Sequence, residues 1–115
     1  MSPASRTTAR HYRWGKASDG WHLPEGDDLS VIEKRIPPDA AKTRRRHRAT
    51  RQFFYAIEGE ATLEANGILH VLAPGEGLPI PPGVMHQLHN EGTTDARFLV
   101  ISVPRSHGDR KDVSV

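Results

Sequence analysis

The amino-acid sequence predicts an all-β protein, folded as a single sandwich or barrel of antiparallel strands. Short runs rich in Val, Ile, Phe and Leu recur along the chain, and Pro, Gly, Asn and Asp separate them at the spacing typical of such folds. No segment carries a convincing helical pattern. A chain of 115 residues is large enough for one domain with a single core.

The strands follow from these runs and from the residues that end them. The first predicted strand, Leu29–Ile36, stops at a pair of prolines. Asn66-Gly67 is the strongest hairpin signal in the chain and separates Ala61–Ala65 from Ile68–Leu72. The remaining predicted strands are Arg44–Ala49, Gln52–Ile57, Gly77–Ile80, Met85–Asn90 and Ala96–Val103.

Polar segments flank this predicted body. Residues 1–28 read as a partly ordered lead-in, loosely ordered up to about residue 12, in which Trp14, Trp21 and Leu23 pack onto the body. Residues 29–103 form the predicted barrel, and residues 104–115 form a polar C-terminal tail.

The composition excludes several classes of protein and site. The chain has no cysteine, which rules out disulfides, thiolate metal sites and a cysteine nucleophile. No apolar run approaches the roughly 20 residues of a membrane span. The N-terminal residues MSPASRTTAR lack the apolar centre of a secretory signal. We therefore expect a cytoplasmic protein without a membrane partner.

A basic run spans residues 42–51, where six of ten residues are Lys or Arg, although the formal net charge is only +2. Such a run is either a solvated face or a site for an anion or nucleic acid. Because neighbouring residues of a strand face opposite sides, Arg45 and His47 share one face. We expect three arginines on the other face to be solvated: Arg44, Arg46 and Arg48. The run lacks an aromatic-interleaved pattern and a recognition helix, so we expect no nucleic-acid partner.

The most specific pattern lies between Gly75 and Asn90. This stretch fits G-x5-P-x-G-x2-H-x3-N at every fixed position: Gly75, Pro81, Gly83, His86 and Asn90. Pro81, Pro82 and Gly83 predict a tight turn, in which glycine accepts a positive φ. The pattern resembles the second conserved motif of the cupin superfamily. The resemblance implies a single-domain jelly-roll β-barrel that often holds a metal ion or a small ligand inside.

The first cupin motif, G-x5-H-x-H-x3,4-E-x6-G, is similar to the segment that ends at Gly59. In this alignment Arg45 takes the place of the first histidine, His47 the second and Gln52 the glutamate, while Asp39 replaces the opening glycine. The resemblance thus implies a metal set of His47, Gln52 and His86, with Arg45 in the fourth place.

These departures leave the occupancy of the site open. Imidazoles and an amide oxygen suit one divalent ion, such as Fe, Ni, Mn or Zn, but no carboxylate remains to offset its charge. Arg45 either swings away from the metal or takes its place and binds a carboxylate or phosphate of the substrate. A third reading is a relic site without a ligand. Three apolar residues are expected as pocket-wall, substrate-binding residues or as ordinary core: Phe54, Leu88 and Phe98.

We therefore expect a small metal-dependent cupin enzyme, such as a dioxygenase or isomerase, acting on a small polar or anionic organic substrate. The alternatives are a metal-free module that binds a small ligand through Arg45, and a non-catalytic barrel with a vestigial site. The resemblance also implies a homodimer, which would protect exposed strand edges. Two histidines without motif support are expected at the surface: His22 and His70.

Overall fold

The structure is a computed structural model that describes residues 2–15, 17–26, 28–41, 44–104 and 110–112. The described residues form strands, turns and loops, without a helix. Every strand pairing is antiparallel, which confirms the predicted all-β antiparallel class. No helix in this part of the chain is long and apolar enough to cross a membrane.

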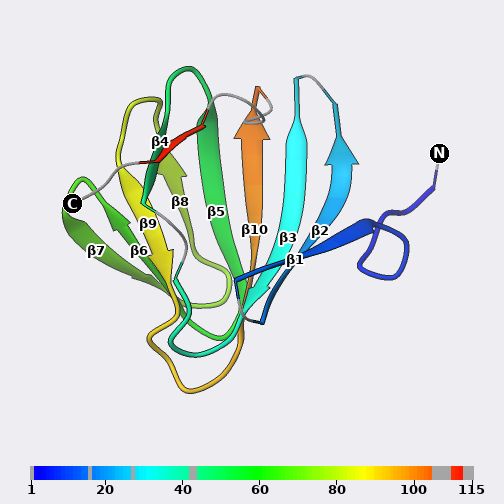
Figure 1. The fold of residues 1–115 in the computed structure, drawn as a ribbon, viewed down its shortest axis with the longest axis horizontal. Helices are drawn as coiled ribbons and strands as arrows, with labels where there is room; N and C mark the ends of the chain where they lie inside the picture. Colours follow the sequence, from blue (N-terminus) through cyan, green and yellow to red (C-terminus); the bar gives the residue numbers. More distant parts are fainter. Residues whose placement is uncertain (1, 16, 27, 42–43, 105–109, 113–115) are drawn as a thin grey trace.

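The strands form two sheets (Figure 1). The six-stranded sheet has the order β1 (Arg10–Trp14), β2 (Ser18–Glu25), β3 (Ser30–Ile36), β10 (Ala96–Val103), β5 (Arg51–Glu58) and β8 (Gly77–Ile80). The five-stranded sheet has the order β11 (Arg110–Asp112), β4 (Arg45–His47), β9 (His86–His89), β6 (Ala61–Ala65) and β7 (Ile68–Leu72).

The predicted antiparallel jelly roll is present, but its strands form two separate sheets and the structure shows no closed barrel. No ladder in the described residues joins the edge strands of one sheet to those of the other, so β1, β8, β11 and β7 are edges. One core nevertheless unites the sheets. Its buried side chains come from both: Ile36, Phe54, Ala56, Ala61, Leu63, Leu72, Ile80, Leu88, Ala96, Phe98 and Val100. The fold is therefore a two-sheet jelly-roll sandwich rather than one closed sheet.

The N-terminal segment differs most from the sequence-based expectation. The predicted lead-in contains two strands, β1 and β2, which extend the six-stranded sheet beyond β3. Trp14 and Trp21 belong to these strands, and Trp14 packs against the core. The tail also contributes a strand, since β11 pairs with β4, while residues 105–109 and 113–115 lie outside the described part.

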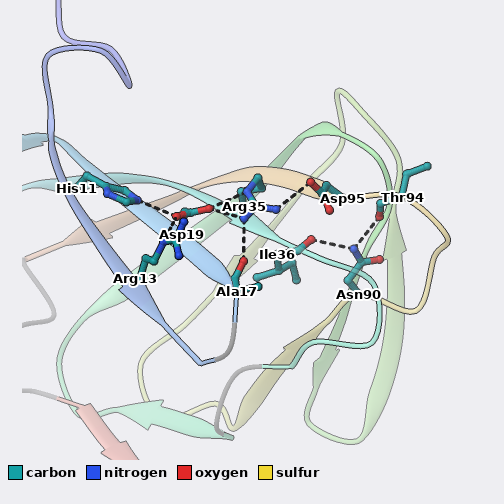
Figure 2. A network of polar contacts seen from close by, with 9 residues as sticks. All are labelled: His11, Arg13, Ala17, Asp19, Arg35, Ile36, Asn90, Thr94 and Asp95. Atoms are coloured by element: carbon teal, nitrogen blue, oxygen red, sulfur yellow. Dashed lines mark hydrogen bonds and ion pairs between the residues drawn. The ribbon is translucent and has the colours of Figure 1, made fainter.

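Charged side chains on the outer face attach β1 and β2 to β3 (Figure 2). His11 Nε2 lies 2.8 Å from a carboxylate oxygen of Asp19, and Arg35 Nε donates to the other oxygen at 2.8 Å. Arg35 also donates to Asp95 at 2.9 Å and to the carbonyl of Ala17 at 2.7 Å. Although burial alone raises the pKa of Asp19, hydrogen bonds from His11 and Arg35 outweigh it and lower the pKa.

The register of the ladders assigns side chains to the two faces of the six-stranded sheet, because residues directly opposite one another share a face. Starting from the buried core residues Phe98 and Phe54, three cross-strand rows lie on the interior face. The first row is Tyr12, Gly20, Lys34, Phe98 and Ala56. The second row is Arg10, His22, Ile32, Val100, Phe54 and Leu78. The third row is Ser30, Ser102, Gln52 and Ile80.

The edge strand β7 is the most exposed apolar segment. Ile68, Leu69 and Val71 are 62%, 60% and 58% exposed, and the strand contains no charged residue. Asn66 and Gly67, at φ of 52° and 80°, form the predicted turn between β6 and β7.

Candidate functional site

The three residues predicted as metal ligands lie on three strands and are all buried. His47 ends β4, Gln52 is on β5 and His86 begins β9, and they are 5%, 8% and 6% exposed. The rings of His47 and His86 lie with centroids 5.7 Å apart. Arg45 is directly opposite His86 in the ladder between β4 and β9. The structure thus brings both histidines together beside Arg45, at the end of the sandwich where β5 begins.

The turn before β9 fixes this arrangement. Gly83 has a φ of 83°, as predicted from the Pro-Pro-Gly sequence, and a side chain would be strained there. Its N–H donates to the carbonyl of His47 at 2.7 Å. The turn that precedes His86 is therefore bonded to the residue whose ring lies beside it.

A backbone contact orients the ring of His86. Its Nδ1 lies 3.1 Å from the carbonyl oxygen of Val84, which can only accept a hydrogen bond. Nδ1 therefore carries the proton in the neutral ring, and Nε2 retains the lone pair that a metal or a proton donor can use. Metal-binding histidines are commonly held in this way by a backbone carbonyl.

Gln52 is only partly satisfied. Its Nε2 donates to the hydroxyl of Ser102 at 3.0 Å, on the neighbouring strand of the same interior row. Its Oε1 is buried and accepts no hydrogen bond from any described residue. A buried carbonyl without a donor is costly and is an unusual feature of a folded protein. The oxygen is thus available to a ligand.

Arg45 contributes a positive charge to the site, and the ladder between β4 and β11 places Asp112 opposite it. Within the described part of the chain, no group of three or more His, Cys, Asp or Glu side chains is arranged to hold a metal. In the six-stranded sheet, the interior rows carry the buried Lys34 and no carboxylate among the side chains that the structure describes. A divalent ion at His47, Gln52 and His86 would therefore keep its charge uncompensated by these residues.

The donor set fits a metal in kind, and its two histidines also fit one in spacing. Two neutral imidazoles and an amide oxygen are acceptable ligands for Fe, Ni, Mn or Zn. The separation of the two rings is of the size that imidazoles on one ion adopt, since each metal–nitrogen bond is about 2.1 Å. We expect these residues to bind a divalent ion with modest affinity, because all three donors are neutral and a guanidinium lies nearby.

The predicted pocket-wall residues lie deeper than the polar cluster. The ring of Phe54 packs edge-on against His86, with centroids 5.6 Å apart, and against Phe98 at 6.4 Å. Leu88 and Phe98 are each 1% exposed and belong to the core. Contact with a ligand stays a prediction for all three, and Phe54 is the one that touches the polar cluster.

Three interior residues were missed from the sequence: Tyr12, His22 and Lys34. His22 was expected at the surface, but it is half-buried and its ring lies 5.0 Å from that of Tyr12. Lys34 is 6% exposed, with its ammonium 5.6 Å from the centre of the Trp14 ring. The alternation of aromatic and charged residues in RHYRW was the available signal of a strand with one inward face.

A separate depression of about 390 Å³ lies beside Phe53, Pro79, Ile101 and Val103. These side chains belong to the outer face, since Phe53 and Ile101 are opposite one another in the register that alternates with the interior rows. Phe53 and Tyr55 stack there with centroids 6.2 Å apart, and each is 37% exposed. Gln52 and Ile80, from an interior row, also line the depression, so it borders the β5 end of the polar cluster.

Solved structures of similar shape come from several bacteria. KdgF from Halomonas sp. aligns with a TM-score of 0.83 and 19% identity, over 91% of this chain and 94% of that one. The polyketide cyclase RemF from Streptomyces resistomycificus aligns with a TM-score of 0.83 and 22% identity, over 100% and 87% of the two chains. A predicted oxalate decarboxylase from Thermotoga maritima aligns with a TM-score of 0.82 and 17% identity, over 90% and 100%. At these identities the likeness concerns the fold.

No curated protein matches the sequence. The family described as Cupin domain matches residues 33–102, which is most of the chain and includes both motif regions. Together with the two-sheet jelly roll and the placement of His47 and His86, this match establishes that the chain belongs to the cupin family.

Proposed function

We propose that this cupin is a metal-dependent enzyme acting on a small anionic organic substrate in its interior. The observation that carries the proposal is the buried cluster at the end of β4, β5 and β9. There, the Nδ1 of His86 faces the carbonyl of Val84, its ring lies beside that of His47, and the carbonyl oxygen of Gln52 has no donor among the described residues. A polyketide cyclase and a predicted oxalate decarboxylase share this fold, so the fold is compatible with an enzyme, and the site has to identify the function.

In this proposal His47, Gln52 and His86 hold the ion, and the ion supplies Lewis-acid polarisation of a substrate oxygen. Arg45 binds a carboxylate or phosphate of the substrate through paired hydrogen bonds. Val84 keeps His86 in the tautomer that leaves Nε2 unprotonated. Phe54, packed against His86, keeps water from that side of the cluster.

A metal-free binding module is the second candidate, and a specific observation favours it. The family position normally taken by a glutamate is Gln52, and Arg45 is directly opposite His86, so a fixed positive charge stands beside the histidines. In this candidate Arg45 and the amide of Gln52 hold the anion without an ion between them.

Metal content after purification without chelator separates the two candidates. We expect bound Fe, Ni, Mn or Zn in the natural protein and its loss in His86→Ala. The matched control is His89→Ala, on the same strand but facing away from the interior row, which should keep the metal. Arg45→His should bind metal more tightly, because it removes a positive charge and adds an imidazole.

Equal metal content in the natural protein and His86→Ala would contradict the assignment of the ligands. A metal-free protein that does not take up these ions, yet binds an organic anion in the presence of chelator, would support the second candidate.

We also propose that the protein forms a homodimer through the outer face of the six-stranded sheet. The stacked pair Phe53 and Tyr55 and the neighbouring depression offer the apolar surface such an interface uses. Light scattering on Phe53→Lys should report a monomer if this face pairs. A dimer of unchanged stability would place the interface elsewhere.

A further inference from the structure

One interior row of the six-stranded sheet is polar, at the end of the sheet where β5 begins. In this row Ser102 on β10 is opposite Ser30 on one side and Gln52 on the other. The three residues are 4%, 3% and 8% exposed, in the order Ser30, Ser102 and Gln52. Burial of hydroxyls and an amide is unfavourable unless hydrogen bonds compensate for the lost water. The partners of these groups therefore decide what the row can do.

Ser102 holds one end of the Gln52 amide. Nε2 of Gln52 donates to the Ser102 hydroxyl oxygen at 3.0 Å, in a buried hydrogen bond. Because the nitrogen and the oxygen of a primary amide point in different directions, an amide held through Nε2 directs Oε1 away from Ser102. That oxygen has no donor among the described residues. Ser102 therefore determines which end of the amide is left for a ligand.

The amide lies close to the histidine pair along the interior face. Gln52 and Phe54 are two residues apart on β5 and share a face, which separates them by about 7 Å along the strand. The ring of Phe54 packs against that of His86, and the ring of His86 lies beside that of His47. An interaction that fixes the Gln52 amide therefore acts at the border of the proposed ligand site.

A serine hydroxyl is compatible with two orientations of this amide, because it can both donate and accept a hydrogen bond. In the structure the hydroxyl accepts from Nε2, so the amide offers an oxygen, which is a ligand for a cation. After rotation by half a turn, Oε1 would accept from the hydroxyl, and the amide would offer N–H groups, which bind an anion. The two candidate functions thus require opposite orientations of one side chain.

We infer that Ser102 determines the charge of the ligand that the site accepts, by holding Gln52 in the orientation that suits a cation. Its hydroxyl oxygen accepts from Nε2 and leaves Oε1 for the ion that His47 and His86 also bind. Ser102 is a positioning residue, since it acts through Gln52 and not on the ion. The inference rests on the proposed function. It explains how an amide, which has only one end that a cation can use, serves as a metal ligand here.

Ser30 provides a matched control for a titration of metal binding. We would remove metal from the full chain with chelator, dialyse it and titrate it with Zn²⁺ and Ni²⁺ by calorimetry. The variants are Ser102→Ala, Ser102→Thr and Ser30→Ala. Ser30→Ala removes a hydroxyl of similar burial from the same row, but it leaves the hydrogen bond between Gln52 and Ser102 in place.

We expect Ser102→Ala to weaken metal binding about 10-fold, which is the lower end of the effect of losing a residue that orients a metal ligand. Ser102→Thr keeps the hydroxyl and should restore the affinity of the natural protein. Ser30→Ala should leave the affinity unchanged. Unchanged binding in Ser102→Ala, or an equal loss in Ser30→Ala, would overturn the inference.

The Gln52→Glu background separates orientation from general support of the site. Both ends of a glutamate side chain are oxygens, so its rotation leaves the metal ligand the same. Gln52→Glu should bind Zn²⁺ more tightly, because a carboxylate offsets the charge of the ion. Adding Ser102→Ala to Gln52→Glu should then weaken binding by less than about 3-fold. A loss as large as in the Gln52 background would show that Ser102 supports the structure of the site without selecting an end of the amide.

NMR of the natural protein tests the orientation without a metal and without a change at Ser102. The side-chain amide protons of Gln52 are assigned by their loss in Gln52→Met, while Gln87, the other glutamine of the chain, serves as the reference. We expect a nuclear Overhauser effect between these protons and the β-protons of Ser102, because Nε2 faces the hydroxyl. Its absence would overturn the inference, even if Ser102→Ala folds too poorly to titrate.

The failure of this inference can be told from the failure of the proposed function. No binding of Zn²⁺ or Ni²⁺ by the natural protein or by Gln52→Glu would overturn the proposed metal site, and with it the selection of a cation by Ser102. Metal binding that Ser102→Ala leaves unchanged would overturn the role of Ser102 alone and leave the metal site standing. A metal-free protein in which the amide has the reversed orientation would favour the anion-binding candidate.

Discussion

Two buried side-chain amides lie at opposite ends of the sandwich. They differ in how many of their hydrogen-bonding groups have a partner. Asn90 is 1% exposed and uses its whole amide: Nδ2 donates to the carbonyls of Ile36 and Thr94 (Figure 2), and Oδ1 accepts from the N–H of Gly92. Gln52 is 8% exposed, and its Oε1 accepts nothing from the described residues. The amide of Asn90 thus links a loop to a strand, whereas the amide of Gln52 has an acceptor that no described residue uses.

The two ends of the sandwich also differ in their charged side chains. Near Asn90, the buried Asp19 is matched by Arg35, which also reaches Asp95 (Figure 2). Near Gln52, Arg45 lies beside two histidines, and Asp112 is opposite it in the ladder between β4 and β11. The Asn90 end therefore supplies stability, while the Gln52 end holds polar groups that stability alone does not explain.

The largest expected effect is that of Asn90→Leu. The change leaves two carbonyls and one N–H without their side-chain partner, so we expect a loss of about 3–5 kcal/mol in the free energy of unfolding. Urea denaturation measures it. A loss below about 1 kcal/mol would mean that the Asn90 end does not provide the stability assigned to it.

An intermediate effect is expected for Asp19→Asn, which removes the charge that Arg35 faces. Arg35 is 25% exposed and retains its ion pair with Asp95. We therefore expect Asp19→Asn to lower the free energy of unfolding by about 2–3 kcal/mol, which is less than the cost of breaking a fully buried ion pair. The control is Asp95→Asn at the same guanidinium. Asp95 is 47% exposed, so its loss should cost less than about 1 kcal/mol.

The stability of the protein should also depend on pH through Asp19. The pKa of Asp19 is lower in the folded state, so its stabilising contribution is complete above the unfolded value of about 3.9 and is lost as pH falls through the folded value. The natural protein should therefore lose stability below about pH 4 more steeply than Asp19→Asn. Parallel curves for the two proteins would contradict the assignment.

The smallest expected effect on stability is that of Gln52→Met. It removes the hydrogen bond to Ser102 but also the unsatisfied oxygen, and the volume is nearly conserved, so we expect a change within about 1 kcal/mol. Metal or anion binding should fall at the same time. A loss as large as that of Asn90→Leu would show that Gln52 serves stability, and the comparison would fail.

Many strands and turns of the two sheets could be predicted from the local sequence. Asn66-Gly67 and the turn at Gly83 have the positive φ values that their residues favour, and the strands between them follow from short apolar runs. The burial of His47 and Gln52 on the same side as Phe54 follows from the alternation of side chains along β4 and β5.

The other features of the fold and of the site depend on contacts between residues that are distant in sequence. Whether the sheets close is decided by edge strands, and nothing local to β8 or β7 indicates that they stay unpaired with one another. β1 was missed because most of its polar residues suit a surface segment. Its place is set by contacts that span the sheet: Asp19 with Arg35, and the ring of Tyr12 over Gly20. The unsatisfied oxygen of Gln52 likewise depends on which neighbours tertiary structure places around it.

The edge strand β7 has a practical consequence for concentrated solutions of this protein. Ile68, Leu69 and Val71 combine high β-propensity with exposure above half, and the strand lacks the lysine or proline with which exposed edges commonly prevent sheet growth between molecules. We expect aggregation of the stored protein to begin at β7. A lysine in place of Val71 is the substitution with which to improve its shelf life, since that side chain lies far from the strands that carry the interior cluster.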